Sequence, residues 1–345
     1  MPSLFFRNNF KYIKRNMEST VIKCPSSHTL KVTITKGEGR LNEIFSILPE
    51  SIEKELKKLP SSFFERTEEI RIRLYKPIEL IAVGKPHFLP YQATKEDGVM
   101  ILNKISQFSI YTLEEELKRG YITIGGGHRI GLAGKVVTEQ GKVKAIRHVT
   151  SFNIRIAREK IGIAERFVPY VYQENWLNTL IYGPPQSGKT TLLRDFARLI
   201  SQGTNKIPSQ KVGIVDERSE IAGCVKGIPQ FTFGQRIDVL DSCPKAEGMM
   251  MLIRSMSPEV IIADEIGRKE DAEALLEAVN SGVRLFVSAH GERLEDLMLR
   301  PTLRELIKAG IFDRFLELGK VHLPGTVMKI WGKKNKELLY KAGVK

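Results

Sequence analysis

The sequence contains few cysteines and no long run of apolar residues. Its 345 residues include three cysteines, an odd number without a CxxC pair, which argues against a disulfide framework or a zinc site. Cysteine usage therefore favours a reducing, cytoplasmic setting. Nowhere do about 18 consecutive apolar residues occur, and the apolar patch Leu4–Phe6 is too short for a signal-peptide core. We expect no membrane-spanning helix, and only a peripheral association with any membrane.

Acidic residues are also scarce relative to basic ones. With 54 Lys and Arg against 40 Asp and Glu, the formal net charge is +14. Such a surface attracts nucleic acid, acidic lipid headgroups or an acidic protein, or it simply keeps a basic protein soluble. Part of the excess lies at the ends: residues 1–16 contain no acid, and residues 320–345 contain seven lysines and one acid. Basic ends are often solvated and need not form one binding face.

The residue pattern divides the chain into four parts. Residues 1–40 are polar and basic without a sustained period, and we expect a flexible segment there. Residues 41–165 mix helical and alternating patterns, residues 166–320 alternate strand, loop and helix, and residues 321–345 form a basic C-terminal segment. We therefore expect two folded domains between two basic ends.

The first folded part is predicted to be a smaller α+β domain, because its helical and alternating patterns occur in mixed order. Its expected elements are an apolar segment at 44–48 before Pro49, helices at 52–59 and 101–117, strands at 69–74, 78–83 and 154–157, and glycine-rich strands joined by tight turns at 120–137.

The second part is predicted to be an α/β domain with a parallel sheet, because repeated strand–helix units imply a sheet covered by helices on both faces. Its expected strands are 177–182, 212–215, 260–263 and 285–289, and its expected helices are 190–200, 246–256, 271–279 and one beginning at 294–299.

The strongest motif is a GxxxxGKT loop that follows an apolar strand and opens a helix. Its glycines let the loop wrap closely, so that backbone N–H groups and the helix N-terminus face phosphate oxygens. Lys189 would reach the β- and γ-phosphates, and the Thr190 hydroxyl would hold magnesium. The sequence thus predicts a site for ATP with Mg²⁺. It consists of Gly183, Pro184, Pro185, Gln186, Ser187, Gly188, Lys189, Thr190 and Thr191.

A second motif is the acidic pair Asp264-Glu265, which follows the apolar run at 260–263. Groups at the carboxyl ends of parallel strands face the ligand crevice. Asp264 is therefore predicted to help hold magnesium, and Glu265 to orient or deprotonate the attacking water. A glutamate at this position favours hydrolysis over nucleotide sensing alone.

Two further strand ends carry polar residues. Asp216 and Glu217 could polarise water or contact magnesium, or could form an exposed acidic turn paired with Arg218. His290 could sense the γ-phosphate, or could be a structural histidine that caps its strand. We predict catalytic roles for Glu265, Lys189, Glu217 and His290.

An ATPase also needs positive charge on the transferred phosphoryl group. Six arginines are candidates, although each could instead be a surface or salt-bridge residue. They are Arg129, Arg155, Arg158, Arg218, Arg236 and Arg254. The GxxG sequence at Gly131–Gly134 matches the loop of an RNA-binding KH fold, but four residues in a glycine-rich stretch are weak evidence.

These residues resemble a known family, that of stage III sporulation protein AA, the ATPase of endospore-forming bacteria. The resemblance covers roughly residues 41–320. It rests on the stretches Val215–Gly223, Arg236–Gly248 and Met249–Gly267, and on the shorter pieces Ile47–Pro49, Glu69–Arg73, Tyr111–Leu117, Gly120–Arg129 and Asn153–Arg158.

The resemblance implies a P-loop NTPase of the RecA-like, additional-glutamate class, similar to the traffic ATPases of type II and type IV secretion. It implies a hexameric ring at the cytoplasmic face of a membrane channel between mother cell and forespore. Gly183–Thr190 would be the Walker A loop and Asp264-Glu265 the Walker B pair. Asp216-Glu217 would correspond to the acidic box, and His290 to the histidine box, whose longer pattern is absent here.

Three functions fit the sequence. The first is an oligomeric motor ATPase that drives a secretion-like channel during sporulation. The second is an ATP-dependent nucleic-acid-binding protein, motivated by the basic charge and the GxxG match; no histidine has an arginine four positions before it, so the Arg/His signature of one related module is absent. The third is a nucleotide-gated scaffold, against which Glu265 argues.

Overall fold

The computed structural model describes residues 38–106, 114–319, 325–333 and 337–340. Its described residues form two compact units, with the boundary between Arg158 and Glu159. The residue pattern predicts a domain boundary after residue 165. The earlier boundary has a local cause, because the Glu159 carboxylate accepts a 2.7 Å hydrogen bond from the Thr232 amide within the second unit.

The first unit contains a six-stranded antiparallel sheet in the order β3-β2-β1-β6-β5-β4. Its strands are β1 (Thr67–Arg73), β2 (Pro77–Ala82), β3 (Lys85–Gln92), β4 (Tyr121–Ile124), β5 (His128–Glu139) and β6 (Lys142–Arg155). Its helices are α1 (Glu38–Ile47), α2 (Glu50–Lys57), α3 (Ser61–Phe64), α4 (Lys95–Ile105) and α5 (Glu114–Arg119), with a 3₁₀ turn η2 at Gly125–Gly127.

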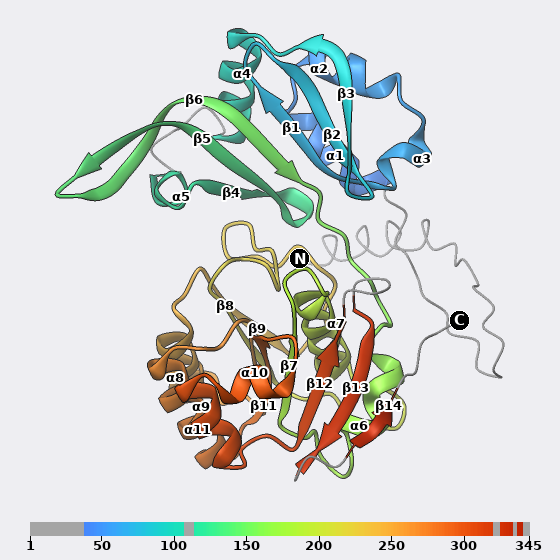
Figure 1. The fold of residues 1–345 in the computed structure, drawn as a ribbon, viewed down its shortest axis with the longest axis vertical. Helices are drawn as coiled ribbons and strands as arrows, with labels where there is room; N and C mark the ends of the chain where they lie inside the picture. Colours follow the sequence, from blue (N-terminus) through green and yellow to red (C-terminus); the bar gives the residue numbers. More distant parts are fainter. Residues whose placement is uncertain (1–37, 107–113, 320–324, 334–336, 341–345) are drawn as a thin grey trace, which may run out of the picture. The chain divides into compact units, whose positions relative to one another are not determined.

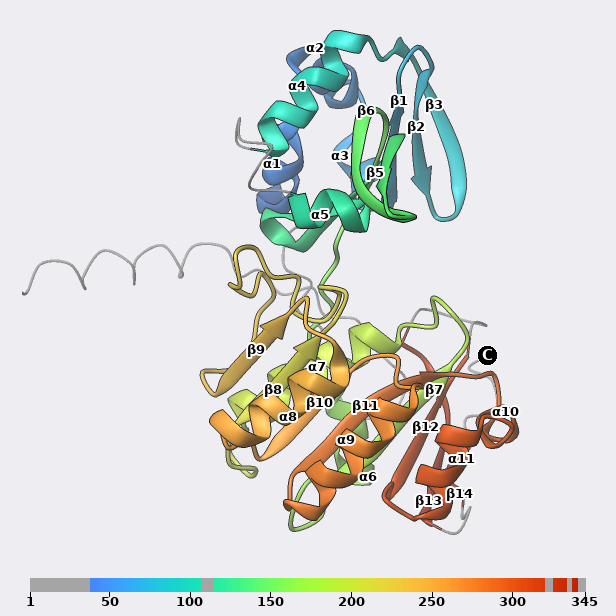
Figure 2. The same cartoon turned by 90° about the vertical axis from the view of Figure 1, so that its left-hand side faces the viewer.

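Strand alternation builds the core of this unit. Ile70 of β1 lies opposite Leu80 of β2 and Ile154 of β6, and all three are fully buried. They pack with apolar residues of α1, α2 and α4, which cover one face of the sheet (Figure 2). The α+β character of this unit agrees with the sequence pattern.

The second unit contains an eight-stranded sheet in the order β14-β13-β12-β7-β11-β10-β8-β9 (Figure 1). The strands from β12 to β9 run parallel, and β13 and β14 join antiparallel at one edge. The strands are β7 (Thr179–Gly183), β8 (Val212–Asp216), β9 (Ile237–Asp241), β10 (Val260–Ala263), β11 (Arg284–His290), β12 (Arg314–Leu318), β13 (Val327–Gly332) and β14 (Glu337–Tyr340).

Helices cover both faces of this sheet, because its central strands are apolar on both sides. One core cluster includes Leu192 and Phe196 of α7, and the other includes Met249, Leu275 and Leu303 of α8, α9 and α11. The helical segments are η3 (Glu165–Phe167), α6 (Val168–Val171), α7 (Lys189–Gln202), α8 (Lys245–Ser255), α9 (Lys269–Asn280), α10 (Leu294–Met298) and α11 (Pro301–Lys308).

The structure corrects three details of the predictions made from sequence. The single helix expected at 101–117 is wrong: α4 ends at Ile105, and α5 begins at Glu114. Part of the expected helix, residues 107–113, lies outside the described residues. Strands β3, β9, β12, β13 and β14 were not predicted, and the last two lie within the basic C-terminal segment and extend the sheet.

The third correction concerns Gly131–Gly134, which lies within strand β5 and not in a loop between helices. A Cβ at Gly134 would lie 2.5 Å from the His148 carbonyl oxygen, so this glycine permits close pairing of β5 with β6. The match to a KH loop is therefore wrong. Among the described residues, none of the helices is long and apolar enough to cross a bilayer.

Candidate nucleotide site

The glycine-rich loop connects β7 to α7. Gly183 ends the strand, and Gly188 caps the helix with a φ of 93°, in the left-handed region that favours glycine. The Ser187 carbonyl accepts a 2.7 Å hydrogen bond from the Gly325 amide, which ties the loop to the residues before β13. The Ser187 hydroxyl is buried and has no hydrogen-bond partner in the described part of the chain. A phosphate oxygen in the loop would satisfy such a hydroxyl.

The Gly183→Ala variant is expected to destabilise the second unit by about 1–3 kcal/mol, because an added methyl group has no room. Its Cβ would lie 2.6 Å from the Leu318 carbonyl oxygen of the neighbouring strand β12 and 2.8 Å from the Ser187 hydroxyl. Denaturant unfolding measures the loss. Gly267→Ala is the control, because a Cβ there meets no atom within 4 Å. Equal unfolding midpoints for the two variants would contradict this account of the loop.

Lys189 lies at the start of α7 and is buried. Its ammonium donates hydrogen bonds of 3.0 Å to the carbonyls of Gly183 and Pro184, and it lies 3.3 Å from Nδ1 of His290. Since an ammonium can only donate, Nδ1 of His290 is an acceptor, which leaves the ring hydrogen on Nε2. The loop carbonyls therefore hold the Lys189 ammonium at the carboxyl edge of the sheet.

Asp264 follows β10 directly, and its carboxylate connects two hydroxyl groups. One oxygen accepts a hydrogen bond from Thr190 of α7, and the other accepts one from Ser288 of β11. The Thr190 hydroxyl and the Asp264 carboxylate are hard oxygen donors, the kind that Mg²⁺ prefers. The residues present thus fit a magnesium ion bound beside the loop.

Glu265 has a strained backbone, and its carboxylate lies between two donors, His290 and Arg218. Its φ of 54° is unusual for a residue with a side chain, and its amide donates 3.0 Å hydrogen bonds to Asp264 and Ser288. Its carboxylate accepts from Nε2 of His290 at 2.8 Å and pairs with Arg218 at 2.6 Å. His290 therefore bridges Lys189 and Glu265, so the alternative of a purely strand-capping histidine does not describe its contacts.

Asp216 ends β8 and is buried. Its carboxylate accepts backbone hydrogen bonds of 2.8–3.0 Å from Glu220, Ile221 and Ala222. Burial raises the pKa of Asp216 to about 6, and nearby Asp241 adds to the rise, while the three amide donors oppose it. These bonds make Asp216 the anchor of the turn that follows β8.

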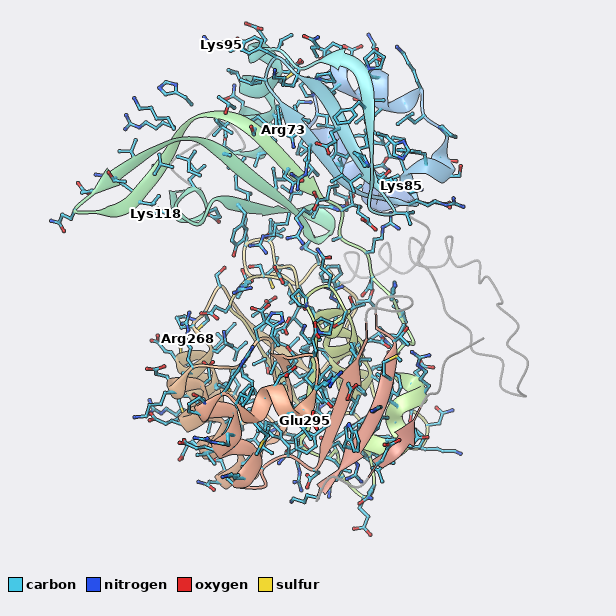
Figure 3. The ribbon with its side chains drawn as sticks, in the orientation of Figure 1. Arg73, Lys85, Lys95, Lys118, Arg268 and Glu295 are labelled. Carbon is cyan, nitrogen blue, oxygen red and sulfur yellow. The ribbon has the colours of Figure 1, made fainter. Side chains whose placement is uncertain are left out.

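Glu217 forms ion pairs with buried Lys245 and, at 3.6 Å, with Arg268, which is labelled in Figure 3. Arg218, which the sequence offered as a partner for this acidic turn, forms an ion pair with Glu265. Acidic and basic residues from β8, α8 and β10 thus meet in one pocket. Its lining residues are Asp216, Glu217, Arg218, Glu220, Lys245, Asp264 and Glu265.

Sequence reasoning assigned no role to two residues of this site: Ser288, which contacts Asp264 and Glu265, and Lys245, which lines the pocket. Ser288 lies two residues before His290 on β11, and its position at a strand end was the available signal. Lys245 opens α8 directly after Pro244, and a lysine there gives no signal until the packing against Glu217 is known.

The other candidate arginines have different partners. Arg129 stacks 3.4 Å from the Tyr121 ring, and Arg155 lies 3.8 Å from Glu69. Arg158 donates to the backbone of Phe64 and Thr67, Arg236 pairs with Glu259 at 3.1 Å, and Arg254 is exposed on α8. Arg218 alone among the six candidates lines the pocket.

Comparison with known proteins identifies the family. The family model described as "Sporulation stage III, protein AA" matches residues 38–338. Stage III sporulation protein AA of Bacillus subtilis (strain 168) is 59% identical over 305 residues, which are 88% of this chain and 99% of that protein. The chain belongs to the stage III sporulation protein AA family. The resemblance found in the sequence is thereby confirmed.

Solved structures of secretion and pilus ATPases share the fold of this family member. The Legionella pneumophila ATPase DotB has a TM-score of 0.53 at 15% identity, covering 81% of this chain and 80% of its own. The pilus retraction motor PilT, solved with bound ADP, has a TM-score of 0.53 at 16% identity, covering 76% of both chains. The second unit thus contains a P-loop NTPase sheet, which confirms the predicted fold class.

Proposed function

We propose that this chain binds ATP with Mg²⁺ and hydrolyses it, as one subunit of an oligomeric, hexameric motor. The motor would energise a secretion-like channel between mother cell and forespore during sporulation. Its location would be cytoplasmic, peripheral at the mother-cell face of the forespore membrane, in contact with channel proteins. Membership of the sporulation family and the fold shared with DotB and PilT support this assignment.

One observation carries the enzymatic part of the proposal. A continuous set of contacts runs from Lys189 through His290 to Glu265, beside the Thr190–Asp264 pair. A phosphate-binding cation and a candidate base are therefore held at a fixed separation by one imidazole. A nucleotide site built only for binding has no need for a carboxylate placed in this way.

Each residue has a proposed role. Residues Gly183–Thr191 surround the phosphates with amide and hydroxyl groups, and Lys189 neutralises charge on the β- and γ-phosphates. Thr190 and Asp264 would hold Mg²⁺, which supplies charge neutralisation when it is bound. Glu265 accepts a proton from the attacking water, and Nε2 of His290 fixes the carboxylate orientation.

Glu217 has a supporting role in this scheme. Its pairs with Lys245 and Arg268 occupy both carboxylate oxygens, so Glu217 holds α8 and the start of α9 against the turn after β8. We therefore propose that Glu217 shapes the pocket, while Glu265 deprotonates the water.

Phosphate release by the full chain at increasing protein concentration tests the proposed function. Hydrolysis is expected to depend on Mg²⁺, and the rate per subunit should rise with concentration as the complex assembles, with sedimentation measuring the assembly in parallel. A constant rate per subunit would contradict the oligomeric motor. Absence of hydrolysis in every assembled state would contradict the enzyme.

A further inference from the structure

The turn Asp216–Ala222 is held by interactions on several sides. From the strand side, the Asp216 carboxylate accepts three backbone N–H groups of the turn. From the helix side, buried Arg194 of α7 donates to the carbonyls of Glu220 and Ile221 at 2.6 and 2.7 Å. Both the donors and the acceptors of one short turn are therefore satisfied by side chains of fixed elements.

Two additional contacts hold the same turn. Ser219 adopts a φ of 53° and donates a 2.6 Å hydrogen bond to Asp241 at the end of β9. The Arg194 guanidinium itself stacks 3.6 Å from the ring of Phe231. A turn held from β8, α7 and β9 is rigid, so the residues at its apex have fixed backbone positions.

Arg218 lies at this apex, and its side chain is 59% exposed. Its guanidinium nevertheless reaches across to Glu265, with Nη1 2.6 Å from Oε2. An exposed ion pair of this kind adds little stability, so folding alone does not account for so strongly held a turn. The Arg218 guanidinium does fix Oε2 of Glu265, and His290 holds Oε1 of the same carboxylate.

We infer that Arg218 is a positioning residue for the reaction: it holds Glu265 in the orientation from which that carboxylate accepts a proton from the attacking water. This inference rests on the proposed function. Glu265 has a backbone φ of 54° and a flexible side chain, and a guanidinium on one oxygen with an imidazole on the other leaves it one orientation. Each oxygen keeps a second lone pair, so the carboxylate can still accept a proton from water.

The test compares steady-state ATP hydrolysis by the full chain carrying Arg218→Ala with the wild type. We expect kcat to fall about ten- to a hundredfold, less than for loss of the base itself, because Glu265 stays present but misaligned, with KM within about threefold. Arg304→Ala is the matched control, because Arg304 is an exposed arginine on α11 of the same unit outside the pocket. A kcat for Arg218→Ala equal to that of Arg304→Ala would overturn the inference.

A double-mutant cycle with Glu265→Gln separates positioning from direct contact with phosphate. Single-turnover rates with excess enzyme allow slow variants to be compared. If Arg218 acts through Glu265, Arg218→Ala changes the Glu265→Gln rate by less than about twofold. An equal loss in both backgrounds would place Arg218 on the phosphate and overturn the positioning role. A wild-type chain without hydrolysis in any assembled state would instead reject the proposed function, which keeps the two failures distinct.

Discussion

The Lys189→Ala variant is expected to lose ATP hydrolysis by about a hundred- to a thousandfold and to bind ATP more weakly. Lys189 is buried among the loop carbonyls, and its ammonium is held by two of them at 3.0 Å. No other lysine lies on the loop, so alanine removes its only ammonium group. Phosphate-release kinetics and fluorescent-nucleotide titration measure the two losses.

Lys206→Ala is the control for this variant, because Lys206 is exposed in the same unit, after α7. Because Lys189 is buried, the stability of the variant must also be measured, to show that the loss of hydrolysis does not come from unfolding. Denaturant unfolding of both variants should show that each is fully folded under the conditions of the assay. A folded Lys189→Ala protein with wild-type hydrolysis would rule out the assigned loop.

The Glu265→Gln variant is expected to keep ATP binding and to lose about a hundredfold or more in kcat. Glutamine has nearly the shape of glutamate and can still accept from His290 or Arg218, but an amide oxygen is a poor proton acceptor. Glu277→Gln is the matched control, because Glu277 is exposed on α9. Equal kcat values for both variants would contradict the role of Glu265 as the base.

Much of the nucleotide site could be predicted because apolar runs in the sequence indicate where the strands end. Apolar runs end at Gly183, Asp216, Ala263 and His290, and parallel pairing brings these ends to one edge of the sheet. The sequence therefore indicated which residues would be neighbours. The chemical roles assigned to them remain predictions that the variants test.

The rest of the site depends on contacts that have no sequence period. The contacts of Arg218 and Lys245 arise from packing of a turn and a helix start against residues far along the chain. A charged residue in a loop has the same local pattern whether it is solvated or paired. Only the fold decides which acid each of these cations meets.

The missed strands have a related physical cause. Strand β3 carries Pro86 and Pro90 at the edge of its sheet, where proline is tolerated but hides the strand signal. Edge strand β9 is partly exposed throughout, so its residues show no clear buried face. Basic composition concealed β13, although Val327 and Ile330 are fully buried against the sheet.

The central claim is that this site cleaves ATP with Glu265 as the base. The most direct measurement is the chemical identity of the nucleotide after one turnover on the assembled full chain, quenched in acid and separated by chromatography. The account predicts ADP and phosphate on the wild type, and intact bound ATP on Glu265→Gln at equal occupancy. Intact ATP on both proteins, or ADP formed equally fast on both, would contradict it.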